Sequence, residues 1–421
     1  MKLNQVAGTA FLTALTSTSL FAQTPAPLRE GVWRGVFQAG QETVPFNFEV
    51  KAGNSVATTK LYLLNARERE ELTDLTQQGD SVFVPIPLYD ATLRFKREGA
   101  DKLTGVYRSN SSGRDLPLTA EYGKTYRFEP GVAPAVNLSG KWDVNIERAP
   151  GDVNKTVGVF EQNGSRVTGT ILTVTGDYRY LDGQVSGNEF VLSSFSGSSP
   201  SVFRGKFTED GKFAGEFRYV RGGFTATGVK NEKAALPDLY SLTNLKPGYA
   251  KLDFTFPDLN GKSVSLNDPK YKNKVVIVTI LGSWCPNCID ETAFLAPWYK
   301  ANRKRGVEII GLAFERKNDL TFAKTALSRL LKRYDVQYDI LFAGIADKKV
   351  ASEALPALNK VLAFPTTIII DKKGNVSQIH TGYTGPATGA YYDEYVQEFN
   401  SHISQLLGDT PAPQASRQTG K

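Results

Sequence analysis

Hydrophobic and polar residues form two different patterns along this chain. From about residue 30 to residue 230, short alternating runs are separated by turn pairs such as Asn163-Gly164 and Asp210-Gly211. Alternation with a period of two predicts short antiparallel strands. From Lys274 onward, an unbroken β-branched run is followed by longer helical patterns, which is typical of strands buried on both faces of a sheet. The chain is therefore predicted to be multidomain, with an all-β N-terminal part followed by an α/β part.

The all-β part contains a faint internal repeat. Trp33 has a counterpart in Trp142, and the segment 102–108 resembles the segment 212–218. Similar spacing between the matching pieces predicts two tandem β modules, residues 30–132 and 136–230. Each is expected to form a small antiparallel barrel or sandwich.

The α/β part, residues 249–408, has the element order of a thioredoxin fold. We expect a right-handed crossover between the first two strands, a helix that closes the domain, and a mixed sheet. The expected strands are 274–281, 307–314, 339–342, 366–370 and 376–381, and the expected helical segments are 289–305, 320–334, 348–362 and 391–407.

The remaining segments are interpreted as connections and termini. Residues 1–22 have Lys2 in front of a modest apolar stretch, which predicts a signal peptide cut after Ala22. That stretch is too short and too rich in hydroxyl groups for the roughly 20 apolar residues of a membrane anchor. Residues 231–248 are the expected linker, and residues 409–421 an expected disordered tail.

Composition narrows the function only a little. The 421 residues are 41% hydrophobic and 22% charged, with a formal net charge of +7, as in ordinary globular proteins. Basic and acidic residues are interspersed, so no nucleic-acid-binding patch is indicated.

The two cysteines of the chain, Cys285 and Cys288, lie where a buried strand is predicted to turn into a helix. Free amide groups and the positive end of the helix dipole stabilise a thiolate at such a position. Cys285 is therefore the expected nucleophile, and Cys288, about one turn inside the helix, the expected resolving thiol.

Two other interpretations of the cysteine pair are weaker. A structural disulfide that closes about four residues would remove only roughly 2 kcal/mol of unfolded-chain entropy. A zinc site needs four ligands, and the two histidines, His380 and His402, lie far along the chain without paired spacing. The C-x-x-C spacing near a βαβ pattern favours a redox dithiol, with no metal and no cofactor expected.

Several motifs around the dithiol resemble the TlpA/ResA-like thioredoxin-fold proteins, which are exported bacterial thiol-disulfide oxidoreductases. The resemblance covers less than half of the chain and leaves the β modules unassigned. The matching pieces are Asp253–Lys262, Gly282–Cys288, Glu291, Phe364–Thr367, Asp371 and Gly374.

The resemblance implies roles for residues near the dithiol. Phe364 and Pro365 are expected to bind substrate, since the proline is cis in thioredoxin folds and leaves the preceding backbone open to a substrate strand. Glu291 lies on the helix face of Cys288 and is expected to accept its proton, although a solvated first-turn glutamate is the alternative. Trp284 is expected to cover the dithiol, unless it is a plain core tryptophan.

Pro286 occupies the first helical turn, which suits a residue without an amide hydrogen, but it offers Cys285 no hydrogen-bond donor. Many thioredoxins instead have proline just before the second cysteine. This difference leaves the direction of the redox reaction open.

The functional prediction is an exported thiol-disulfide oxidoreductase of the cell envelope or periplasm. A reductase is favoured because TlpA/ResA-like proteins usually reduce. Its expected partners are a client protein with a disulfide and an upstream membrane or exported electron donor. One alternative is a binding protein whose β modules hold a ligand or a partner. Another is a thiol peroxidase, whose pattern would place threonine where this chain has Gly282.

Overall fold

The computed structural model describes residues 28–110 and 113–409. Its first part is a curved antiparallel sheet of nine strands in the order β4-β3-β2-β1-β9-β8-β7-β6-β5. The predicted leader, residues 1–22, lies outside the described residues. The strands are β1 (Gly31–Ala39), β2 (Glu42–Lys51), β3 (Lys60–Asn65), β4 (Glu68–Leu72), β5 (Thr76–Gln78), β6 (Ser81–Ile86), β7 (Ala91–Arg97), β8 (Lys102–Ser109) and β9 (Arg114–Tyr122), with short 3-10 turns η1 (Val56–Thr58) and η2 (Pro87–Tyr89).

The second part repeats this strand order but closes into a barrel, because β11 pairs with β12 and β12 pairs with β14. The predicted fold class, tandem β modules before a thioredoxin fold, is confirmed. The strands are β10 (Gly140–Glu147), β11 (Val153–Asn163), β12 (Arg166–Thr173), β13 (Gly176–Asp177), β14 (Leu181–Ser186), β15 (Glu189–Ser194), β16 (Ser201–Phe207), β17 (Phe213–Tyr219) and β18 (Gly223–Lys230).

Equivalent residues have equivalent contacts in the two β modules. The indole Nε1 of Trp33 donates to the Arg29 carbonyl at 2.9 Å, and that of Trp142 donates to the Leu138 carbonyl at 2.8 Å. Both tryptophans lie in the aromatic core of their module. The repeat predicted from the sequence therefore corresponds to a repeated strand order with its own core in each copy.

The third part contains the five-stranded mixed sheet β23-β22-β21-β24-β25 of a thioredoxin fold. All seven residues of β21 are buried, as its unbroken apolar run requires. A small hairpin, β19 (Thr255–Pro257) and β20 (Ser263–Ser265), precedes the sheet. The other elements are β21 (Val275–Leu281), β22 (Val307–Glu315), β23 (Asp339–Ile345), β24 (Thr366–Ile370), β25 (Val376–Thr381), α1 (Pro286–Asn302), α2 (Leu320–Tyr334), α3 (Lys348–Ala354) and α4 (Ala390–Leu407), with 3-10 turns η3 (Pro269–Tyr271), η4 (Arg303–Arg305) and η5 (Pro386–Thr388).

Two helices differ from their predicted bounds by more than one residue. The helical segment predicted over 348–362 is wrong beyond Ala354, because Leu355 precedes Pro356 and leaves the helical backbone region, with φ −125° and ψ 70°. Helix α1 begins at Pro286 rather than at residue 289, since proline suits the first helical position. At the other end of the domain, Asp409 follows α4 and forms an ion pair with Arg305.

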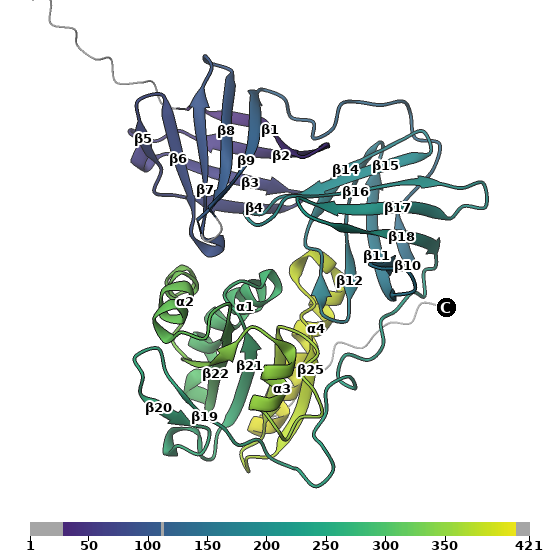
Figure 1. Ribbon diagram of the computed structural model, residues 1–421. Coiled ribbons are helices and arrows are strands. Elements are labelled where there is room, and N and C mark those ends of the chain that lie inside the picture. Colours follow the sequence, from purple (N-terminus) through teal and green to yellow (C-terminus); the bar gives the residue numbers. More distant parts are fainter. Residues whose placement is uncertain (1–27, 111–112, 410–421) are drawn as a thin grey trace, which may run out of the picture.

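Figure 1 shows the two β modules side by side above the thioredoxin-fold domain, with the start of α1 directed toward them. A buried ionic cluster joins the three parts. Arg179, between β13 and β14, pairs with Glu68 at the start of β4 and, at 2.8 Å, with Asp290 of α1. The side chains of all three are at most 16% exposed. Because each part contributes one charge, the cluster fixes their relative position.

Further polar contacts surround this cluster. Asp177 accepts a hydrogen bond from the Gly385 amide at 2.9 Å. Arg329 of α2 pairs with Asp90 at 2.9 Å, and Arg333 pairs with Glu70 at 3.2 Å. Both β modules are therefore attached to the thioredoxin-fold domain by charged and polar groups, and apolar contacts of Leu88, Tyr89 and Tyr391 add to this junction.

Removing the shared charge should weaken this junction. We expect Arg179→Met to destabilise the protein by about 3–5 kcal/mol, because it leaves the carboxylates of Glu68 and Asp290 buried without their partner. The measurement is denaturant unfolding. The matched control is Arg204→Met, whose more exposed pair with Glu42 should contribute at most about 1 kcal/mol. Equal, small effects of the two substitutions would show that the cluster does not join the parts.

Candidate active site

Cys285 lies at the junction between the buried strand β21 and helix α1, as its N-cap residue. Its backbone is extended, and its Sγ accepts a hydrogen bond from the Cys288 amide at 3.3 Å. The thiol also donates to the Phe364 carbonyl at 3.2 Å. An amide donor at a helix start stabilises a thiolate. The sulfur of Cys285 therefore has a donor for its charged form and an acceptor for its protonated form.

Cys288 lies one turn inside α1 and is fully buried, whereas Cys285 is 5% exposed. Burial raises the pKa of the Cys288 thiol well above its usual range, and the neighbouring Cys285 and the Glu291 carboxylate raise it further. The two thiols are thus in unequal surroundings. Cys285 is the sulfur closer to solvent, and Cys288 needs a proton acceptor before it can react.

Glu291 is that candidate acceptor, and it lies in the interior of the domain. It is 1% exposed, so the alternative of a solvated first-turn glutamate is wrong. Its two carboxylate oxygens accept hydrogen bonds from the hydroxyl groups of Thr279 on β21 and Thr367 on β24. Burial raises the pKa of Glu291 to about 7, while the two threonines act in the opposite direction. A carboxylate with such a pKa can exchange a proton near neutral pH.

The other predicted residues surround the dithiol. Trp284 donates from Nε1 to the Phe314 carbonyl at 2.9 Å, and its ring packs edge-on against Phe364 at 5.5 Å. Trp284 is only partly buried, so it is not a plain core residue. The Phe364–Pro365 peptide bond is cis, as the family resemblance implies, and the Phe364 carbonyl faces the Cys285 thiol. Pro286 is half-buried at the first position of α1.

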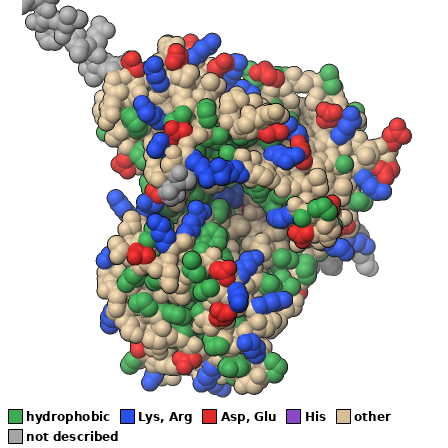
Figure 2. All heavy atoms as spheres, in the orientation of Figure 1, with side chains coloured by type: hydrophobic (Ala, Val, Ile, Leu, Met, Phe, Trp, Pro, Cys, Tyr) green, Lys and Arg blue, Asp and Glu red, His purple; other side chains and the backbone are tan. Residues whose placement is uncertain are grey.

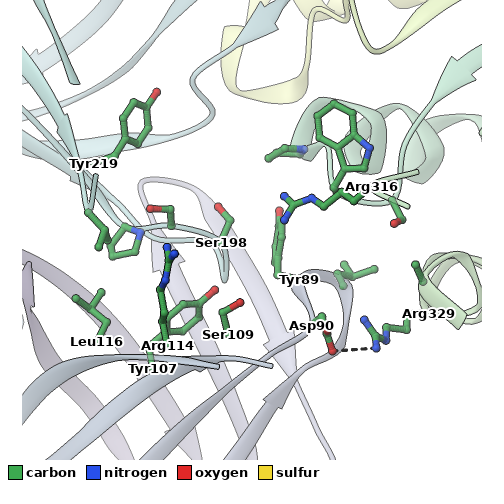
Figure 3. Close-up of a pocket in the computed structure, with 18 of the residues that line it drawn as sticks. Tyr89, Asp90, Tyr107, Ser109, Arg114, Leu116, Ser198, Tyr219, Arg316 and Arg329 are labelled. Atoms are coloured by element: carbon green, nitrogen blue, oxygen red, sulfur yellow. Dashed lines mark ion pairs between the residues drawn. The ribbon is translucent and has the colours of Figure 1, made fainter. Parts of the chain in front are cut away.

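The β modules reach the C-x-x-C motif itself, which the sequence did not reveal. The backbone of Gly176 passes so close to Asn287 that an added Cβ would lie 1.9 Å from its Nδ2. Two cavities, of about 910 and 460 Å³, lie between the β modules and the dithiol, and Pro286 lines both of them. Figure 3 shows the larger cavity, with residues from both sides of it. Surfaces far apart in sequence therefore form the surroundings of the dithiol.

Several residues that support the site were not predicted from the sequence. The Ser283 amide and hydroxyl both donate to the Glu315 carboxylate at 2.8 Å, which fixes the loop before Cys285. Thr279 is the polar residue of an otherwise apolar strand, and that exception was the available signal for a buried hydrogen-bond partner. No sequence signal pointed to Arg179.

Metal ligands do not gather in the described part of the chain, where no group of three or more His, Cys, Asp or Glu side chains could hold an ion. His380 is buried, with Nδ1 3.0 Å from the Gly382 carbonyl. His402 lies 3.0 Å from the Ser377 hydroxyl. Neither histidine is directed at the dithiol by these contacts.

A cysteine pair at the start of α1, beside a cis-proline that precedes the neighbouring strand β24 of a mixed sheet, defines a thioredoxin-fold redox protein. Residues 247–379 match the AhpC/TSA family. Solved structures of similar chains include a thiol:disulfide interchange protein of Chlorobium tepidum, 22% identical, which covers 39% of this chain and 99% of its own, with a TM-score of 0.29. The thioredoxin domain of a thiol-disulfide oxidoreductase from Bacteroides vulgatus is 24% identical, covers 37% of this chain and 99% of its own, and has a TM-score of 0.28.

Curated relatives place the chain in a narrower family. The thiol-disulfide oxidoreductase ResA of Bacillus thuringiensis is 30% identical over 146 residues, which is 35% of this chain and 74% of that protein. ResA of Geobacillus kaustophilus is 31% identical over 33% of this chain and 72% of its own length. The chain belongs to the ResA family of thiol-disulfide oxidoreductases. The match covers the thioredoxin-fold part and leaves the β modules without a counterpart in these two alignments.

The raised pKa of Glu291 makes the stability of the protein depend on pH. Between about pH 4.5 and pH 7 the unfolded chain loses the Glu291 proton while the folded protein retains it, so stability falls as pH rises through this window. We expect Glu291→Gln to remove this contribution. The unfolding free energy of Glu291→Gln minus that of the native protein should be larger at pH 7.5 than at pH 4, by on the order of 3 kcal/mol.

The measurement is denaturant unfolding at both pH values, with the exposed Glu209→Gln as the control. A pH-independent difference between Glu291→Gln and the native protein would mean that Glu291 titrates normally in the fold.

Proposed function

We propose that this protein is an exported reductase of protein disulfides that acts through the dithiol Cys285-Pro286-Asn287-Cys288. The observation that carries the proposal is the position of the Cys285 sulfur, which caps helix α1 and accepts the Cys288 amide hydrogen bond. Membership of the ResA family supports thiol-disulfide exchange as the reaction. The direction of electron flow and the nature of the client belong to the proposal.

The reaction proceeds in two exchanges. The Cys285 thiolate attacks one sulfur of the client disulfide, which forms a mixed disulfide and releases the other client sulfur as a thiolate. The Cys288 thiolate then attacks the sulfur of Cys285, which releases the second client thiol and leaves a Cys285–Cys288 disulfide. Two electrons pass to the client, and an external dithiol donor must return them.

Glu291 supports the second exchange in this proposal. Cys288 reacts as a thiolate, but its surroundings favour the protonated thiol. The buried Glu291 carboxylate accepts that proton as Cys288 attacks, because its raised pKa makes it a better base than an exposed glutamate. Thr279 and Thr367 are positioning residues that orient the carboxylate.

Export is proposed from the sequence of residues 1–22, which lie outside the described residues. None of the helices between residues 28 and 409 is long and apolar enough to cross a membrane. A membrane or exported electron donor and a client protein with a disulfide are the partners that this function requires. In an oxidising compartment such a donor keeps the dithiol reduced.

The alternative of a binding protein has one observation in its favour, the cavity of about 910 Å³ lined by both β modules. Trp284 and Pro286 line the same cavity, so a bound molecule would lie beside the dithiol. We therefore propose that binding by the β modules serves the redox reaction. A peroxidase remains a weaker proposal, because Gly282 stands where that pattern requires threonine.

The order of attack predicts a trapped intermediate. We expect Cys288→Ser to accumulate a covalent complex between Cys285 and a client disulfide, because the chain has no other thiol to release it. The complex should survive denaturation and dissolve on addition of reductant, as seen by non-reducing electrophoresis. Cys285→Ser should abolish disulfide reduction, and the double variant Cys285→Ser, Cys288→Ser is the control that should trap nothing. Full reductase activity of Cys285→Ser would contradict the nucleophile assignment.

We also propose that residues 249–408 form an independently folding redox unit, after the linker 231–248. Its contacts with the β modules combine ion pairs and polar hydrogen bonds with some apolar contacts, while most of its apolar residues belong to its own core. A fragment from Gly248 onward should be soluble and should reduce a model disulfide in the presence of a dithiol donor. An insoluble or inactive fragment would show that the β modules complete the fold or the site.

A further inference from the structure

The start of α1, beside the dithiol, borders a partly open cleft between the β modules and the thioredoxin-fold domain. Two loops of the β modules, residues 87–90 and 197–200, line the larger cavity opposite Trp284 and Pro286. We call these segments the roof loops. The smaller cavity shares Ser198, Ser199 and Pro286 with the larger one, so the two cavities meet at the helix start. In Figure 2 this region is a hollow between the upper and lower halves of the molecule.

Specific contacts hold the roof loops in place. The Tyr107 hydroxyl donates to the Gly197 carbonyl at 3.1 Å. Gly197 has φ +103°, and a Cβ there would lie 2.7 Å from Ile86, so this close approach requires glycine. In the other roof loop, Asp90 forms an ion pair with Arg329 of α2. Because Cys285 is only 5% exposed, a narrow or flexible segment should reach its sulfur more readily than a rigid folded surface.

The size of the space indicates what can enter. A cavity of about 910 Å³ lies at the upper end of the roughly 300–1,000 Å³ range of small-molecule sites. Such a space accommodates a short extended stretch of peptide and excludes a globular domain.

The charges of the lining indicate the chemistry of that peptide. Asp90 pairs with Arg329 and Asp115 with Arg108, while Glu315 is bonded to Ser283 and adjoins Arg316 in sequence. This leaves surplus positive charge at Arg114 and Arg221, which have no ion-pair partner within the described residues. Figure 3 shows Arg114 directed into the cavity from β9, and Arg316 entering from the thioredoxin-fold side. The uncompensated lining charge is therefore positive on the side of the β modules.

We propose that this cavity is the client-binding site and that it takes an extended, acidic peptide segment that carries the disulfide. This inference rests on the proposed function and adds the class of client. The segment is either a free peptide or a flexible terminus of a larger protein, since both present the same chemistry. The exchange is the one given above: two electrons pass from the dithiol to the peptide disulfide, and an added small dithiol returns them.

The test uses the full chain and three synthetic peptides with one internal disulfide and acidic, neutral or basic flanks. We expect kcat/KM to be roughly tenfold higher for the acidic than for the neutral peptide, because attraction by a charged cleft raises association rates. The preference should shrink as salt is added. The double variant Arg114→Glu, Arg221→Glu should reverse the preference, and the milder Arg114→Gln, Arg221→Gln should reduce it toward equality.

The matched control is Arg94→Glu, an exposed arginine of β7 outside both cavities, which should keep the acidic preference.

Two further arms of the experiment distinguish a free peptide from a flexible terminus of a larger protein. The acidic peptide is fused to the end of a folded carrier, and separately its disulfide is built into a rigid surface hairpin of that carrier. We expect the terminal fusion to be reduced about as fast as the free peptide, and the rigid hairpin at least tenfold more slowly.

The possible outcomes separate this inference from the proposed function. Equal Cys285-dependent rates for the three peptides would overturn the acidic client and leave the reductase proposal standing. Reduction of the rigid hairpin as fast as the free peptide would overturn the restricted access. Failure to reduce any disulfide would overturn both proposals.

Discussion

The arrangement of this protein depends on the ion pairs of Arg179, whose side chain is largely buried. Arg179 neutralises Glu68 of the first β module and Asp290 of the helix that bears the dithiol, while belonging itself to the second β module. A buried charge without a partner costs several kcal/mol, so the three parts are constrained to meet at this point. The consequence is that the roof loops lie opposite the C-x-x-C motif, and all three described parts contribute to the surroundings of the dithiol.

A second constraint governs the chemistry beneath the roof loops. Glu291 is buried next to a thiol that is also buried, and among the described residues two threonine hydroxyls donate hydrogen bonds to its carboxylate. Each group makes the charged form of the other less favourable. That arrangement costs stability at neutral pH, and it is the arrangement that a proton transfer between Cys288 and Glu291 requires. The fold tolerates this loss of stability because β21 and α1 belong to the same hydrophobic core.

The sequence predicted most of the thioredoxin-fold part because its signals are local. A seven-residue buried strand, a cysteine at the following helix start, and a proline before β24 each follow from short patterns. The bounds of α3 were wrong because the Leu355-Pro356 pair stops the helix within an otherwise helical pattern. The β modules were predicted as barrels or sandwiches, but closure of the second one depends on β12 pairing with β14 as well as with β11, and alternation alone does not specify the partners of a strand. The cluster around Arg179 was unpredictable for the same reason: its members are separated by more than 100 residues, and each resembles an ordinary surface charge in sequence.

The central claim is that Cys285 and Cys288 form a reducing dithiol. The most direct test is the reduction potential of this pair in the full-length protein, measured by equilibration with a thiol buffer. Burial and Glu291 disfavour the Cys288 thiolate and so give the dithiol form little extra stability. We expect a strongly negative potential, near the roughly −270 mV of thioredoxin. A potential near the roughly −120 mV of a strong disulfide oxidant would contradict it.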